Sequence, residues 1–371
     1  MKGLFISPDL GLSGADKSLY ATLRSLREIL PSLLVPFWRG GGSKKKLLER
    51  LEKQKIHNLQ KLLLRPLPRS YCYLGAPSGP LEPLKERFKQ AMWRLYQPLF
   101  KREIRSYSFL HLNSLSLYPA ISEKLPCILH VREVSQNPSA LLKKALLTAS
   151  GVIFIDETTR RPFRELPLKN WITLENPFEM REPEKGEVEA LREAVSLPES
   201  HTLFALIGDL IPVKGVERAI RAFLKLQEPK AALLLVGKTP EKAYKKRCLS
   251  LARGDRRIRF LGHLENISPL YALTDVVLRA DPFFALGRTA LEGLYSGCRL
   301  ILPGEESDLQ AAEALSPFKR EILLYQPGSL ESLFQAMQAL SRHKASNRKF
   351  FGNLASYGKR FEEFIRLSLP S

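Results

Sequence analysis

Short apolar, β-rich runs alternate with longer helix-like stretches along the 371 residues of the chain. This alternation constrains the fold most, because strands that are each followed by a helix assemble into parallel sheets. The expected strands cover residues 3–7, 33–37, 71–74, 108–112, 127–131, 152–155, 171–174, 203–207, 232–236, 258–261, 276–278, 300–302 and 322–324. The pattern therefore predicts an α/β protein with two sets of βα units.

The helix-like stretches complete the two sets, which a polar stretch at residues 179–199 separates. Expected helices cover residues 16–30, 44–64, 84–106, 139–149, 157–166, 216–226, 240–252, 267–273, 288–295, 309–315, 330–340 and 347–369. At about 150 residues per domain, the length fits two domains. We expect domains at 1–178 and 179–345, a linker near 176–185, and a final helix within 346–371 that packs back toward the first domain.

Several classes of protein are disfavoured by simple patterns. The longest apolar runs are strand-sized, far below the roughly 18–20 residues of a membrane span. Pro8 and Asp9 interrupt the apolar N-terminus, which predicts a first strand and not a signal peptide. The four cysteines make no CxxC pair and the six histidines no HExxH, so we expect no disulfide framework and no metal. A cytoplasmic protein is the expectation.

The positive charge of the chain is unevenly distributed. Lys and Arg number 58 against 38 Asp and Glu, for a net charge of +20. Residues 1–176 hold 29 Lys and Arg against 14 acids, whereas residues 177–371 hold 29 against 24. Such an excess indicates an anionic partner, such as nucleic acid, a membrane surface or a phosphorylated substrate. No nucleic-acid-reading motif accompanies it, so nucleic acid is not the expected partner.

Three glycine-containing segments follow expected strands, where open parallel sheets bind ligands. Residues 11–16 place Ser13 and Gly14 before a helix, which suits an anion or a sugar, although a plain βα turn is the alternative. Residues 208–215 join Gly208 to Lys214, which would aim an ammonium group at a phosphate unless it is a surface lysine.

The third segment, residues 281–293, places Gly287 before a short helix that carries Arg288 and Glu292. A carboxylate there can accept hydrogen bonds from ribose hydroxyls, and the helix N-terminus with Arg288 can meet a pyrophosphate. The alternative is an i,i+4 surface ion pair.

The order of these segments resembles the family 4 glycosyltransferases, also called glycosyl transferases group 1. GDLIPVKGVERAIRAF, LLLVGK and IRFLGHLENISPLYALTDVVLRADPFFALGRTALEGLYSGCRLILPG resemble the donor-binding domain. SGADKSLYATLRSL, FLHLNS, LHVREVS and LENPFE resemble segments of the N-terminal domain. The resemblance implies the GT-B fold, in which two Rossmann-like domains with parallel sheets face a central cleft. It also implies that the N-terminal domain binds the acceptor and the C-terminal domain the nucleotide sugar.

Site roles follow from the resemblance position by position. Glu292 is expected to bind the donor ribose and Lys214 the diphosphate, with Gly208 and Gly287 beside them and Gly14 and Ser13 in the first domain. Arg288 is offered as a second phosphate cation. The acceptor segment reads Arg132-Glu133, which makes Glu133 a candidate catalytic residue, with His130 two positions earlier. Two departures stand out: Phe284 occupies the position of the family's first Glu, and Asp209 that of its Arg.

The resemblance implies a retaining, metal-independent hexosyltransferase that needs no cofactor and uses a UDP- or GDP-sugar donor. Because the first half carries the charge, we expect a lipid-linked or other anionic glycan acceptor of cell-envelope polysaccharide or glycolipid synthesis. Basic helices at 44–64 and 84–106 would bind the inner face of the cytoplasmic membrane, unless their apolar faces pack on the sheet. The alternatives are a non-catalytic scaffold of the same fold, another enzyme of that fold such as an epimerase, and a nucleic-acid-binding protein.

Overall fold

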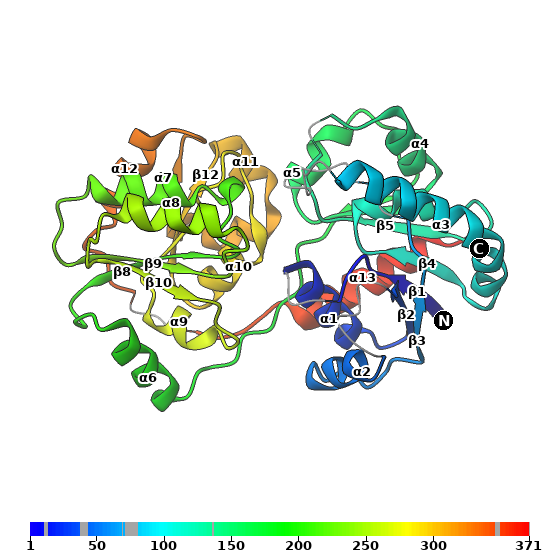
Figure 1. Ribbon diagram of the computed structural model, residues 1–371, viewed down its shortest axis with the longest axis horizontal. Coiled ribbons are helices and arrows are strands. Elements are labelled where there is room, and N and C mark those ends of the chain that lie inside the picture. Colours follow the sequence, from blue (N-terminus) through cyan, green and yellow to red (C-terminus); the bar gives the residue numbers. More distant parts are fainter. Residues whose placement is uncertain are drawn as a thin grey trace. The chain divides into compact units, whose positions relative to one another are not determined.

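The chain forms two compact units, each an α/β layer structure (Figure 1). The computed structural model describes residues 1–10, 14–37, 44–68, 70, 81–135, 137–345 and 349–370. Unit 1 comprises Met1–Phe178 and Asn353–Ser371, and unit 2 comprises Glu179–Gly352. The chain therefore leaves unit 1 once and returns to it for its last helix.

Unit 1 is built on a parallel sheet of seven strands in the order β3-β2-β1-β4-β5-β6-β7. The strands are β1 (Lys2–Ile6), β2 (Leu30–Pro36), β3 (Lys61–Arg65), β4 (Phe109–Leu112), β5 (Cys127–Val131), β6 (Gly151–Phe154) and β7 (Trp171–Thr173). The central strands are buried on both faces, as their continuous apolar runs predict for a covered parallel sheet.

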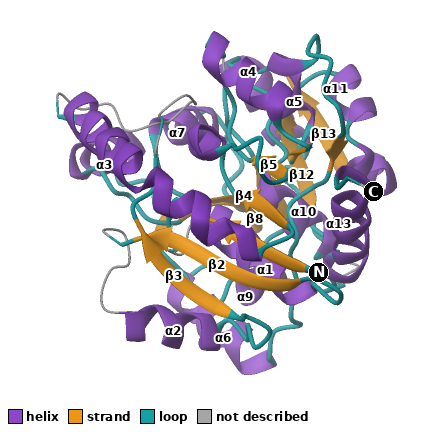
Figure 2. Cartoon of the chain, turned by 90° about the vertical axis from the view of Figure 1, so that its right-hand side faces the viewer, coloured by secondary structure: helices purple, strands orange, loops and turns teal. Residues whose placement is uncertain are grey.

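Helices cover both faces of this sheet. Leu4, Leu110 and Leu129 point to the face covered by α3 (Glu82–Glu103) and α4 (Ala140–Thr148). The other face packs against α1 (Gly14–Ser25), α2 (Lys44–Lys53) and α13 (Leu354–Ser368). The shorter helices of unit 1 are η1 (Ile104–Ser106), η2 (Leu115–Ala120), α5 (Glu157–Arg160) and η3 (Arg161–Phe163). Figure 2 shows α3 at one margin and α2 beyond β3.

The last helix, α13, lies beside α1 although more than 300 residues separate them in the sequence (Figure 1). The Thr22 and Tyr357 hydroxyls are 3.1 Å apart in this contact. Glu362 is buried, and its Oε1 accepts hydrogen bonds from the backbone N–H groups of Arg27, Glu28 and Ile29 at 2.8–3.1 Å. These bonds satisfy a buried charge and fix the C-terminal helix on unit 1.

Unit 2 repeats the architecture with a parallel sheet of six strands in the order β10-β9-β8-β11-β12-β13. They are β8 (Thr202–Ile207), β9 (Ala231–Val236), β10 (Ile258–Gly262), β11 (Val276–Leu278), β12 (Arg299–Pro303) and β13 (Ile322–Tyr325). The helices are α6 (Lys185–Val195), η4 (Pro212–Lys214), α7 (Val216–Leu224), α8 (Lys242–Ala252), α9 (Ser268–Leu273), α10 (Gly287–Tyr295), α11 (Glu306–Ala311), η5 (Glu313–Glu321) and α12 (Leu330–Ala339).

Two segments differ most from the sequence expectation. The expected helix at 44–64 ends at Lys53, and residues 61–65 form β3, because pairing with β2 overrides the helical spacing of the leucines. The polar stretch at 179–199 contains the helix α6, which buries Val195 and packs on α9. The strand expected at 71–74 lies outside the described residues. Within the described part of the chain, no helix is long and apolar enough to cross a membrane.

Candidate functional site

The strand order places two loops of unit 2 next to each other. The chain adds β9 and β10 on one side of β8 and then crosses over to place β11 on the other side, so that β8 and β11 are hydrogen-bonded neighbours. Gly208 follows β8, and Asp281 lies three residues after β11. Open parallel sheets bind their ligands at such a switch point, beyond the carboxyl ends of the strands.

Lys214 meets a buried carboxylate at this edge. Its Nζ lies 3.1 Å from Oδ1 of Asp281, whose side chain is 2% exposed. Nη2 of Arg279 lies 2.8 Å from the other oxygen, Oδ2, so one carboxylate binds two cations. The positive charge of Arg279, followed by burial, lowers the pKa of Lys214. Lys214 is thus a cation held in place beside a second positive charge, and not the solvated surface lysine of the alternative interpretation.

Two glycines permit this packing. Gly215 has φ +65°, and a Cβ there would lie 1.8 Å from the carbonyl oxygen of Ala280. Gly287 has φ +54°, and a Cβ would lie 2.8 Å from Nη1 of Arg279. A side chain at Gly215 would clash with the backbone, and a side chain at Gly287 would be strained by the positive φ and would require Arg279 to shift. The loop of Lys214 and the N-terminus of α10 consequently both close on the end of β11.

Glu292 is buried in α10 and is held by two side chains. Its Oε1 lies 2.7 Å from Nε of Arg288, and its Oε2 accepts a hydrogen bond from the Tyr271 hydroxyl at 2.8 Å. Burial and the adjacent carboxylate raise the pKa of Tyr271. The i,i+4 pair with Arg288 is therefore present, but Glu292 lies in the interior, where an unpaired carboxylate would be costly.

The remaining positions of the unit 2 site divide into buried and exposed ones. Gly208 has φ +139°, and a Cβ there would meet no described atom within 4 Å, so its surroundings are open. Asp209 is exposed. Phe284, at the position of the family's first Glu, is buried and lies against Gly304, where a Cβ would be 2.7 Å from its ring. An apolar ring therefore stands at the sequence position where the family resemblance implies a carboxylate.

Three residues of this site, Arg279, Asp281 and Tyr271, have no role in the sequence analysis. A signal for the first two is present in the sequence, because ionisable residues directly follow the buried strand β11. Their backbone is also fixed: the Tyr325 hydroxyl donates to the carbonyl of Arg279 at 3.2 Å, and Arg218 donates to that of Ala280 at 2.7 Å.

The unit 1 residues lie at the corresponding edge of the first sheet. Gly14 is exposed at the start of α1, where a Cβ would meet no described atom within 4 Å, and Ser13 lies outside the described residues. Glu133 accepts hydrogen bonds from the Ser114 hydroxyl and from the backbone N–H groups of Leu115, at 2.9 Å, and Arg132, at 3.2 Å. Burial raises the pKa of Glu133. These contacts fix the start of η2, and a catalytic role for Glu133 stays a prediction.

Arg132 joins a buried network beside Glu133. It donates to Asn113 Oδ1 at 2.7 Å and to Asn176 Oδ1, and its Nη2 lies 3.3 Å from Nδ1 of His130. Burial and Arg132 lower the pKa values of His130 and His111 well below the usual range. Both imidazoles are therefore neutral near pH 7.

The hydrogen bonds also define the ring protons. Because arginine only donates, Nδ1 of His130 accepts, and the ring proton of His130 sits on Nε2. His111 Nε2, 3.2 Å from the same Nδ1, must then donate. His130 Nε2 and His111 Nδ1 are buried and have no hydrogen-bond partner among the described residues.

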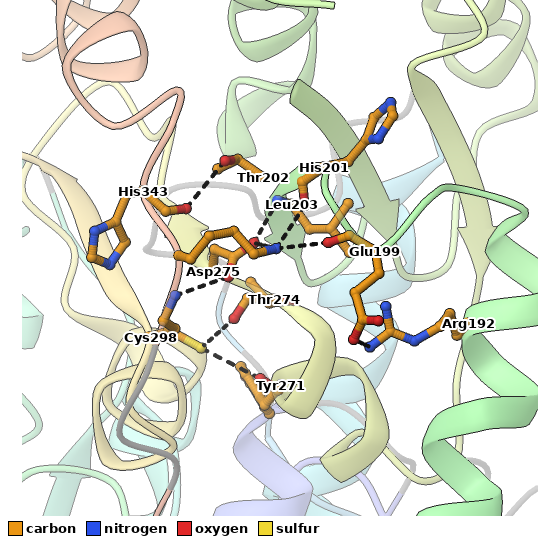
Figure 3. Close-up of polar contacts among 12 residues, drawn as sticks. Arg192, Glu199, His201, Thr202, Leu203, Tyr271, Thr274, Asp275, Cys298 and His343 are labelled. Atoms are coloured by element: carbon orange, nitrogen blue, oxygen red, sulfur yellow. Dashed lines mark hydrogen bonds and ion pairs between the residues drawn. The ribbon is translucent and has the colours of Figure 1, made fainter. Parts of the chain in front are cut away.

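A different buried carboxylate, Asp275, directly precedes β11 and so lies at the end of the unit 2 strands opposite to Lys214. Figure 3 shows Asp275 among its polar contacts. Its oxygens accept hydrogen bonds from Leu203 N at 2.9 Å, Lys344 Nζ at 3.0 Å and Ala345 N at 3.0 Å. Lys344 also donates to the His201 carbonyl at 2.8 Å. These contacts tie residues 343–345 to the start of β8, which is a structural function.

The described residues include no group of three or more His, Cys, Asp or Glu placed to hold a metal ion. Residues 201–343, which contain the whole unit 2 site, match the family model described as Glycosyl transferases group 1. This segment is a group 1 glycosyltransferase domain. The resemblance predicted from the sequence is confirmed.

One curated relative matches the chain in part. N-acetyl-alpha-D-glucosaminyl L-malate synthase from Bacillus anthracis is 29% identical over 136 residues, which are 36% of this chain and 36% of the relative. The chain thus aligns with about a third of the length of that protein.

Solved structures match over nearly the whole chain. Alr3699/HepE from Anabaena, in complex with UDP and glucose, has a TM-score of 0.70 at 17% identity and covers 99% of this chain and 100% of its own. WaaG, a glycosyltransferase involved in lipopolysaccharide biosynthesis, has a TM-score of 0.61 at 13% identity, covering 99% and 94%. At these identities the likeness establishes the fold. The group 1 domain is part of a GT-B architecture, as predicted.

Proposed function

We propose that this protein is a family 4 glycosyltransferase that moves a sugar from a nucleoside-diphosphate sugar to a glycan acceptor in cell-envelope polysaccharide or glycolipid synthesis. The observation that carries the proposal is that Lys214, through Asp281 and Arg279, and the N-terminus of α10, through Gly287, both close on the end of β11, while the same helix holds Glu292. Cations and a helix N-terminus suit a diphosphate, and a fixed carboxylate suits ribose hydroxyls.

The donor is a UDP- or GDP-sugar. The Anabaena protein that shares the fold was crystallised with UDP and glucose and with UDP-glucose, which favours UDP. In this chain Lys214, held by Asp281, would compensate the charge that develops on the departing diphosphate. Arg279 lies behind Lys214 and Gly287, so it adds positive potential to the same end of the sheet. Because Asp281 offsets one of these two positive charges, Arg288 at the N-terminus of α10 stays the proposed substitute for the family Arg that Asp209 replaces.

The proposed reaction retains the anomeric configuration and needs no metal or other cofactor, as the family resemblance implies. Catalysis is then positioning and electrostatic stabilisation. Tyr271 and Arg288 hold Glu292 in one orientation, which presents it to the ribose as a fixed group. Phe284 leaves the transferred sugar without the carboxylate of the family's first Glu, so we expect a relaxed or altered sugar preference.

The acceptor binds unit 1, where most of the positive charge of the sequence lies. A lipid-linked or other anionic glycan fits this charge. Glu133 and the segment around Gly14 and Ser13 are the proposed acceptor-side residues. The protein would work in the cytoplasm, at the inner face of the membrane, with no role for nucleic acid.

A non-catalytic partner protein of the same fold is the second candidate, and Phe284 and Asp209 favour it. Calorimetric titration with UDP and GDP, followed by a sugar-nucleotide turnover panel, separates the two. We expect nucleotide binding that weakens roughly tenfold or more in Lys214→Ala and in Glu292→Gln. Lys185→Ala, which removes an exposed lysine of α6, is the matched control. Absence of nucleotide binding would overturn the donor site, and binding without hydrolysis or transfer would favour the non-catalytic partner.

A further inference from the structure

The outer side of α3 carries an apolar stripe that faces solvent. Leu84, Phe88, Leu95 and Leu99 are each 62–76% exposed, and their spacing of four and seven residues places them on one side of the helix. The opposite side buries Trp93, Tyr96, Phe100 and Ile104 in the unit 1 core. The helix is therefore apolar on two opposite sides, and the sheet covers one of them.

The first half of α3 has little support from the described part of the chain. From Leu84 to Met92, none of the described side chains is buried. Helices in proteins draw most of their stability from the packing of an apolar face, and a segment of two or three turns is marginal alone. Leu84 and Phe88 are the large apolar side chains available there, and an external surface that covered them would stabilise this half of the helix.

The surroundings of the stripe are basic. Arg87 flanks it, Arg102 continues it at the C-terminal end of the helix, and Arg94, Lys101 and Arg105 extend the charge along one border, all exposed. The acid Glu103 is turned away, with its Oε1 2.8 Å from Arg65 Nη2 and its Oε2 bonded to Tyr96. A partner that is apolar inside and anionic at its surface complements this pattern.

The positive surface continues into a groove of about 680 Å³ between α3, η2 and α4. Arg94, Lys101, Lys124 and Lys144 line it, with a single acid, Glu123. Leu141, at its rim on α4, is 70% exposed. The groove thus adds cations and a further exposed apolar side chain beside α3.

We propose that α3 docks unit 1 on the surface of an anionic lipid bilayer. Leu84, Phe88, Leu95 and Leu99 enter the boundary between headgroups and acyl chains, while Arg87 and Arg102 meet lipid phosphates. This docking surface specifies how the membrane association of the proposed function occurs, and it rests on that proposed function. A second copy of the chain or a protein partner would instead bury the stripe without lipid.

Vesicle flotation of the full chain without nucleotide sugar tests the docking. We expect the protein to float with phosphatidylcholine vesicles that contain about 30% phosphatidylglycerol, to stay behind with phosphatidylcholine alone, and to bind less at high salt. Phe88→Ser/Leu95→Ser should weaken partition roughly tenfold or more, because two large side chains no longer enter the bilayer. Arg87→Gln/Arg102→Gln should also weaken binding to the anionic vesicles, because two cations no longer meet lipid phosphates.

Leu367→Ser is the matched control, since Leu367 is 77% exposed on α13 of the same unit. Circular dichroism checks that each variant is folded. Equal flotation of wild type and Phe88→Ser/Leu95→Ser would overturn the docking. A wild-type protein that never floats, and that forms a dimer which this variant breaks, would also overturn it. UDP binding without flotation refutes the docking and leaves the proposed transferase intact. Flotation without nucleotide binding refutes the proposed transferase and leaves the docking intact.

Discussion

Lys214 Nζ lies 3.1 Å from Oδ1 of Asp281, although 67 residues separate the two in the sequence. Asp281 is a partner of Arg279 as well, so a single buried carboxylate organises both cations at the switch point. A lysine held in this way has a defined position before any diphosphate arrives. The arrangement leads to separate predictions for stability and for the pH dependence of activity.

Asp281→Ala should destabilise unit 2 and weaken nucleotide binding. It leaves Arg279, whose side chain is 7% exposed, without its carboxylate, and loss of one partner of a buried pair costs about 3–5 kcal/mol. Chemical denaturation gives the change in the free energy of unfolding. Asp255→Ala, which removes a partly exposed partner of Arg257, serves as the control with a smaller loss. A loss below about 1 kcal/mol for Asp281→Ala would contradict the organising role.

Arg279→Gln should move the alkaline limb of the kcat/KM profile to higher pH. Lys214 acts as a cation, so activity falls as pH rises through its pKa, and the charge of Arg279 lowers that pKa. Without Arg279, the pKa of Lys214 rises and Asp281 serves Lys214 alone. The control is Arg299→Gln, at the start of β12, where the arginine Nη1 donates to the carbonyl of Arg320 at 2.9 Å; this variant should leave the limb in place. An alkaline limb of Arg279→Gln that stays at the same pH or moves to lower pH would refute the effect of Arg279 on the pKa of Lys214.

Tyr271→Phe should weaken UDP binding while unit 2 stays folded. The change removes the hydrogen bonds from the Tyr271 hydroxyl to Oε2 of Glu292 and to the Thr289 carbonyl, and Arg288 stays as the partner of the carboxylate among the described residues. Loss of one hydrogen bond to a buried charged group costs about 1–3 kcal/mol, part of which should appear as a several-fold weaker affinity. Calorimetry measures it, with Tyr244→Phe on α8 as a control. Unaltered affinity would mean that Glu292 does not need this orientation, or does not touch the nucleotide.

The buried His111–His130 pair should make unit 1 less stable in mild acid. The folded-state pKa values of both residues lie well below the unfolded value of 6.5. Below pH 6.5 these two histidines therefore bind more protons in the unfolded chain than in the folded chain. Each histidine then lowers the free energy of unfolding by up to about 1.4 kcal/mol per pH unit until its folded pKa is reached.

Glu133 has the opposite effect on the pH dependence of stability, because burial raises its pKa above the unfolded value of 4.5. Its contribution lowers the free energy of unfolding as pH rises from 4.5 to its folded pKa. The contribution of the histidines is therefore measured as the difference between wild type and a histidine variant, since Glu133 is present in both. Denaturation of wild type and His111→Asn between about pH 5 and 7 should show a flatter pH dependence in the variant. Parallel curves would show that His111 titrates alike in the folded and unfolded chains.

Strand positions can be predicted closely, because buried parallel strands are short, continuous apolar runs whose pattern is local. The expectations for 127–131 and 276–278 coincide with β5 and β11. The prediction of helix at 61–64, the end of the expected helix 44–64, is wrong because the leucine run fits both periods, and only pairing with β2 selects the strand. The helix α6 escapes prediction for a related reason, since its few apolar residues meet α9, which lies far away in the sequence.

Local pattern and chain order suffice to fix the α/β class, the two units and the placement of Lys214, Gly287 and Glu292 just after strands. Only the folded chain reveals that Asp281 and Arg279 hold Lys214, that Tyr271 holds a buried Glu292, and that α3 exposes a second apolar side. These contacts depend on which strands are neighbours. Sheet pairing brings β8 beside β11 across about 70 residues of chain, and no local pattern encodes that proximity.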